Sequence, residues 1–226
     1  MGKTLPNGRR YKRGMILAAA VALVAPTIAM GGTIANTPHD LSSVSTGPNK
    51  SATQSDTCVF CHVAHNGSPG ANRPLWSHNM TSTNLAWTPT TTVRGTTIPY
   101  IITSVQLQGS RGCMSCHDGT IAMGDLINGV GGTVAGTNLT AGKLTTGINL
   151  LTPTSMQTNH PLGVSMPAAV AGFTAYKTVP PGTAVNYDAN GYVQCDSCHN
   201  PHDDSNTKFL KVNPAGGAIC LTCHNV

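Results

Sequence analysis

All eight cysteines of this 226-residue chain belong to four copies of one pentapeptide, Cys-x-x-Cys-His. In this pattern two thiols form thioether bonds to one haem, and the histidine that follows becomes the proximal ligand of its iron. The sequence therefore predicts four covalently bound haem c groups. The haem-binding cysteines are Cys58, Cys61, Cys113, Cys116, Cys195, Cys198, Cys220 and Cys223, and the proximal ligands are His62, His117, His199 and His224.

Two other uses of cysteine fit this pattern less well. Zinc sites built on C-x-x-C need two such pairs or a distant pair of histidines, and they do not require a histidine directly after every second cysteine. A disulfide framework would not confine all the cysteines to one spacing. Covalent haem attachment accounts for both the spacing and the histidine.

The N-terminus predicts export. A basic segment, an apolar run of 12 residues from Met15 to Pro26 and the small residues around Ala29 form a secretory signal over residues 1–29, with an approximate cleavage point. The apolar run is shorter than the roughly 20 residues of a transmembrane helix. Residues 30–226 are then a single tetrahaem domain without a membrane span, at the cell surface, outside the cell or in the periplasm.

The charge of the chain belongs mainly to this leader. Five of the 13 Lys and Arg residues lie within it, so eight remain against eight acidic residues, all of them Asp. A neutral mature polypeptide offers no basic surface for nucleic acid. There is also no glutamate, no G-x-S-x-G and no phosphate-binding loop, so we expect an electron-transfer protein rather than an enzyme.

The fold is expected to be mostly irregular loop, with short helices at the motifs and few short strands. Aromatic residues make up only 4% of the chain, so we expect the polypeptide to wrap around a stacked core of four haems. The glycine-rich stretch Gly129 to Gly136 and the Asn190-Gly191 turn within Tyr187 to Val193 are either small β elements or irregular loop.

Five histidines remain as candidates for the distal ligand of the four irons. A side chain three residues after a proximal histidine lies on the same side of that haem, so it binds a different iron or none. This applies to His65 and His202 in the two C-x-x-C-H-x-x-H segments. Ligation of all four irons by two histidines would favour electron transfer over catalysis at iron. The distal candidates, of which four are needed, are His39, His65, His78, His160 and His202.

Several further segments resemble exported multihaem c-type cytochromes of metal-reducing bacteria, and most of all the four-haem members that polymerise into extracellular filaments. The resemblance implies bis-histidine haems in alternating parallel and T-shaped pairs, with one distal histidine supplied by the adjacent subunit. It places that role on His65, with His39 second. The segments that carry it are 37–42, 58–66, 74–78, 113–122, 159–161 and 195–203.

Three functions follow as alternatives. The first is a head-to-tail homopolymer that carries electrons to extracellular acceptors and exchanges them with other redox proteins. The second is a monomeric tetrahaem shuttle in the periplasm or at the cell surface. The third is a multihaem reductase, which would need one iron with an open coordination position.

Overall fold

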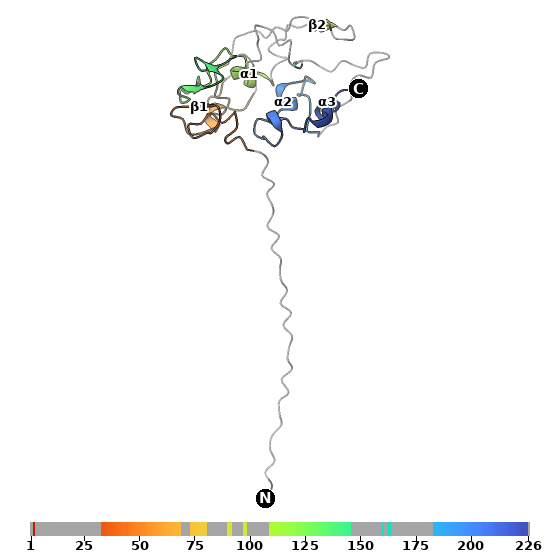
Figure 1. The fold of residues 1–226 in the computed structure, drawn as a ribbon, viewed down its shortest axis with the longest axis horizontal. Coiled ribbons are helices and arrows are strands. Elements are labelled where there is room, and N and C mark those ends of the chain that lie inside the picture. The colour runs from red at the N-terminus through yellow and green to blue at the C-terminus, as the bar shows by residue number, and fades with distance from the viewer. Residues whose placement is uncertain are drawn as a thin grey trace. The chain divides into compact units, whose positions relative to one another are not determined.

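A computed structural model describes residues 33–68, 73–80, 90–91, 97–98, 109–145, 162–163 and 183–225 of the chain, together with Gly2 and His160. The chain divides into two units, Met1–Met30 and Gly31–Val226, and the helices and strands given below all lie in the second unit (Figure 1). The predicted signal peptide falls outside the described residues except for Gly2. In the described parts of the chain, no helix has the length and apolar character needed to cross a bilayer.

Each Cys-x-x-Cys-His motif carries a short helical turn, as predicted. In three motifs the backbone N–H of the histidine donates to the carbonyl of the first cysteine, at 2.8 to 3.0 Å. One turn of this kind brings residues three apart to the same side of the helix, which is where two thioether sulfurs must lie. The helices are η1 (Cys58–Phe60), α1 (Arg111–His117), α2 (Cys195–Cys198), η2 (Thr207–Phe209), η3 (Ala215–Gly217) and α3 (Ala218–Leu221).

Strands are few and short, and each pairs antiparallel with one other. β1 (Asn49–Ser51) pairs with β4 (Val134–Gly136), β2 (Thr90–Thr91) with β3 (Thr97–Ile98), and β5 (Leu139–Thr140) with β6 (Lys143–Leu144). The strand β4 confirms the β interpretation of the glycine-rich stretch.

Two short turns lie in the loops between these elements. Ala141 and Gly142 join β5 to β6 with positive φ at both positions, the conformation that suits a two-residue hairpin. At Asn190-Gly191 a turn closes from Asp188, but no strand is assigned over 187–193, so that segment is a loop.

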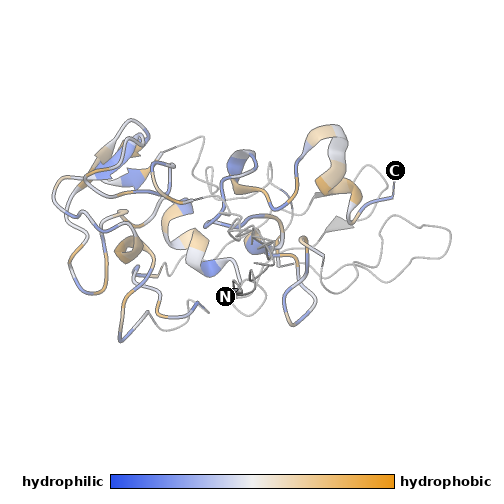
Figure 2. Cartoon of the chain, turned by 90° about the horizontal axis from the view of Figure 1, so that it is seen from below, coloured by the Kyte–Doolittle hydropathy of each residue, from blue (hydrophilic) through white to orange (hydrophobic). Residues whose placement is uncertain are grey.

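A small apolar cluster lies beside the first two motifs. Its buried members are Leu41, Phe60, Met123, Leu126, Val134 and Leu144. Elsewhere hydrophobic residues occur in short pieces between hydrophilic ones, as Figure 2 shows.

Two loops pack closely next to this cluster, and a glycine between them is expected not to tolerate a side chain. A Cβ atom at Gly124 would collide with the Gly132 carbonyl oxygen, which is backbone and has no rotamer to change. We expect Gly124→Ala to lower the free energy of unfolding of the haem-loaded protein by about 1–3 kcal/mol. Guanidinium unfolding followed by circular dichroism measures this. Thr133 has an exposed side chain nearby, so Thr133→Ala should change the free energy of unfolding by less than about 0.5 kcal/mol. Equal losses of stability in the two variants would contradict the steric explanation.

Candidate haem and electron-transfer site

The sulfur atoms of successive motifs lie near one another in chain order. The pKa of the Cys61 thiol is raised to about 12, first by burial and then by repulsion from Cys116 and Cys113 of the second motif. A hydrogen bond joins the sulfurs of Cys113 and Cys195 and raises the pKa of Cys195. The pKa of Cys198 is raised by burial and then by repulsion from Cys223 of the fourth motif. Cysteines of each motif therefore lie near cysteines of the next motif in the chain.

Polar side chains join the second motif to the third. The hydroxyl of Ser110, which is 0% exposed, donates to Gln194 Oε1 at 2.7 Å and accepts the backbone N–H of Cys195 at 3.0 Å. Arg73 donates to the Gly109 carbonyl and forms an ion pair of 3.0 Å with Asp196. These contacts fix the start of α1 against the start of α2.

A tryptophan joins the first motif to the second. The indole N–H of Trp76 donates to Ser115 Oγ in α1 at 3.1 Å. Its ring meets that of His62 edge-on, with centroids 6.2 Å apart. The proximal histidine of the first motif is thereby held beside the helix of the second.

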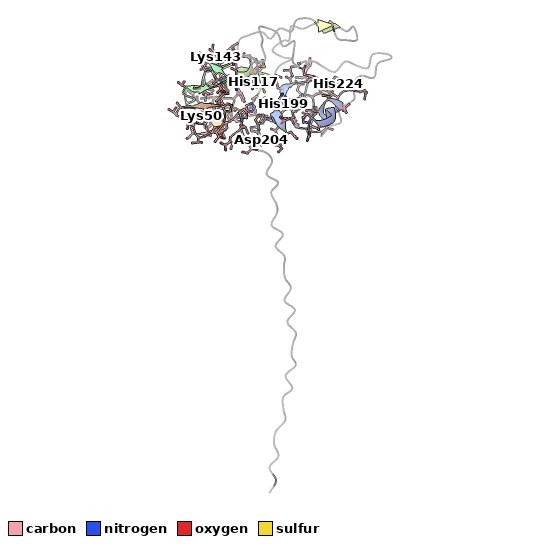
Figure 3. All side chains as sticks on the ribbon, in the orientation of Figure 1. Lys50, His117, Lys143, His199, Asp204 and His224 are labelled. Carbon is pink, nitrogen blue, oxygen red and sulfur yellow. The ribbon has the colours of Figure 1, made fainter. Side chains whose placement is uncertain are left out.

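Three of the four proximal histidines each lie opposite one of the distal candidates. The pairs are His62 with His202 (centroids 6.0 Å apart, planes at 16°), His117 with His39 (6.1 Å, 82°) and His224 with His160 (6.2 Å, 71°). His202 thus meets the proximal histidine of the first motif rather than that of its own. His39 meets its partner within one chain. Figure 3 labels His117, His199 and His224, which lie by α1, α2 and α3 respectively.

The separation within these pairs fits two ligands on one iron. A histidine nitrogen binds a first-row metal ion at about 2 Å and lies about 1.1 Å from the centre of its ring, so two imidazoles on opposite sides of one iron have centroids about 6 Å apart. All three pairs have this spacing. The described residues therefore fit axial ligation by two histidines.

His39 is held in the form that binds metal. Burial lowers its pKa to about 4, and repulsion from His117 lowers it further in the same direction. The ring is therefore neutral near pH 7, which is the protonation state of a metal-bound histidine. Phe209 stacks on it with centroids 4.4 Å apart and planes at 21°.

Three histidines remain outside these pairs. The Nδ1 atom of His199 lies 2.8 Å from the Lys208 carbonyl oxygen, a hydrogen bond that leaves Nε2 for a metal. His78 is 0% exposed, its Nδ1 contacts the Asn79 carbonyl at 3.1 Å, and its Nε2 is buried without a partner. His65 is exposed. His78 and His65 are thus the two predicted distal candidates that lie outside the three pairs.

The resemblance between the first and third motifs extends beyond the sequence repeat. After each motif the chain returns antiparallel to it: Ser77 N–H donates to the Cys61 carbonyl and Val63 N–H to that of Leu75. After the third motif, Lys211 N–H donates to Cys198 and Asn200 N–H to Phe209. We call 75–77 and 209–211 the return segments. Sequence reasoning did not predict these return segments, and no shared spacing of residues marks them.

Both return segments begin with an unusual backbone conformation. Leu75 and Phe209 have φ of 51° and 58°, in the left-handed region that side chains other than glycine rarely adopt. The two residues occupy equivalent positions opposite the residue that follows the proximal histidine. Leu75 is 47% exposed, whereas Phe209 covers His39.

A comparison with protein families matches residues 189–226 to a family described as a doubled CXXCH motif. The match covers the third and fourth motifs. No curated protein matches the chain. The doubled motif indicates a multihaem c-type cytochrome with covalently bound haem c, and it supports electron transfer rather than catalysis.

Proposed function

We propose that this protein carries electrons through four haem c groups, each held between two axial histidines. The observation that carries the proposal is the set of three histidine pairs with ring centroids 6.0 to 6.2 Å apart. Each pair joins a proximal histidine to one from another part of the chain. An iron with both axial positions filled has no place for a substrate, and it can exchange an electron with little change in its surroundings.

The eight cysteines named above would attach the haems, and the pairs would ligate three of the irons. When bound, the haems supply one-electron redox centres, which no side chain of this polypeptide can replace. The proximity of Cys61 to the second motif, of Cys113 to Cys195, and of Cys198 to Cys223 supports electron movement along the motifs in chain order. The Ser110 and Trp76 hydrogen bonds would keep neighbouring haems at fixed separations.

We further propose that copies of the chain assemble head to tail outside the cell, after export. The proximal His199 and the candidate His65 are both exposed, so His65 of one copy is available to the iron at His199 of the next. The resemblance to OmcE, a four-haem cytochrome that forms extracellular filaments, supports this arrangement. Electrons would then pass from cellular redox proteins to acceptors outside the cell.

A monomeric shuttle in the periplasm or at the cell surface is the second candidate. The buried, unpartnered Nε2 of His78 favours it, because this atom could complete the iron at His199 within one chain. No contact to a neighbouring copy would then be needed. The two functions differ in which histidine ligates that iron.

Variants of these two histidines distinguish the candidates. If copies assemble through His65, His65→Ala abolishes filaments in electron micrographs of the purified holoprotein, while His78→Ala retains them. Absorption spectra of the purified holoprotein should then show one high-spin iron per chain in His65→Ala and none in filaments of His78→Ala. Discrete wild-type particles at all concentrations, with a high-spin iron in His78→Ala alone, would establish the shuttle instead.

A further inference from the structure

The three histidine pairs differ in the angle between their ring planes. His62 and His202 are nearly parallel, at 16°, whereas His117 and His39 are nearly perpendicular, at 82°, and His224 and His160 stand at 71°. The spacing of the rings is almost the same in all three. The sites therefore differ in orientation and not in separation.

Ring orientation affects the electronic structure of a ferric iron. Each imidazole interacts through its π system with the iron orbital that lies perpendicular to its plane. Two parallel rings raise the same orbital and separate it from its neighbour, while two perpendicular rings raise both orbitals equally. Electron paramagnetic resonance distinguishes these cases, because nearly equal orbitals give a highly anisotropic low-spin signal and separated orbitals give an ordinary rhombic one.

The orientation of His39 is fixed by a residue of the return segment that follows the third motif. Phe209 stacks on His39 at 4.4 Å and 21°, and its backbone is anchored on both sides. Its carbonyl accepts the N–H of Asn200 at 2.8 Å and its own N–H donates to Asn206 at 3.2 Å. The left-handed φ of 58° at this position turns the chain at the start of its return segment.

We propose that Phe209 is a positioning residue that holds the His39 ring across that of His117 and so sets the electronic class of the second haem site. The proposal rests on the proposed function, because it takes these two histidines as ligands of one iron. In this role Phe209 contacts His39. It acts through the plane of His39.

Electron paramagnetic resonance of the oxidised holoprotein tests the role of Phe209. Wild-type protein should show both highly anisotropic and rhombic low-spin signals. Phe209→Leu removes the flat ring. The highly anisotropic signal should then lose the intensity contributed by one iron, while absorption spectra should show all irons still low-spin. Phe209→Met should give the same loss. Phe209→Tyr, which keeps the ring, should give the wild-type spectrum.

The internal repeat supplies a matched control. Leu75 begins the other return segment with a similar φ but lies exposed, so Leu75→Ala should leave both signals unchanged. An unaltered spectrum in Phe209→Leu and Phe209→Met would overturn the proposal. If the wild-type iron at His117 were high-spin, the result would instead count against the proposed function. If all wild-type irons were low-spin but gave a single type of signal, only this inference would be overturned.

Discussion

One iron in each chain is expected to change from low spin to high spin when His202 is replaced by alanine. His202 lies opposite His62, with parallel rings 6.0 Å apart, and alanine has no atom that can replace the lost ligand. The opened position should then bind carbon monoxide in the reduced protein, which raises the bound share by one quarter of the haem over the wild type. Absorption and electron paramagnetic resonance spectra measure the change.

Two controls separate loss of a ligand from general damage. Added imidazole should fill the open position and restore the low-spin spectrum of His202→Ala. His65 occupies the same place in the first C-x-x-C-H-x-x-H segment, but the ring contacts of the described residues pair it with no proximal histidine, so His65→Ala should alter no iron in the unassembled protein. A fully low-spin spectrum in His202→Ala would contradict the pairing with His62.

The largest loss of stability is expected from Ser110→Ala. This change removes two hydrogen bonds, because the buried Ser110 hydroxyl donates to Gln194 Oε1 and accepts the Cys195 N–H. Since the loss of one partner of a buried hydrogen bond costs about 1–3 kcal/mol, the free energy of unfolding should fall by about 2–4 kcal/mol. Guanidinium unfolding of the holoprotein, followed by far-ultraviolet circular dichroism, gives the value.

An exposed serine provides the comparison for this loss. Ser205 lies in the loop after the third motif and bonds only within its own turn, so Ser205→Ala should change the free energy of unfolding by less than about 0.5 kcal/mol. If Ser110→Ala proved equally mild, the junction between the second and third motifs would not depend on this hydroxyl.

The parts of the fold that sequence reasoning could predict are those with local causes. The helical turn at Cys58 or Cys195 follows from the spacing of the motif itself, and the turn at Gly191 from its neighbours. The loop-rich character follows from the scarcity of aromatic residues. None of these features depends on residues far away in the chain.

The pairing of histidines had no such local cause. His62 and His202 lie 140 positions apart, and five candidates could not be assigned to four irons by counting. The return segments were also unpredictable, because Leu75 and Phe209 adopt a left-handed backbone without being glycine. The stacking of Phe209 on His39 depends on that conformation, and no periodic pattern in the sequence marks it.

The pairing has a consequence for how the protein matures. A chain emerges from its N-terminus, so His39 and His117 are both present once the second motif has appeared. His62 can meet His202 only after the third motif has emerged. His224 meets His160 only when the last residues arrive. Under the proposed ligation, the second motif gains both of its axial histidines before the first motif does. The first motif to emerge is therefore not the first to be enclosed.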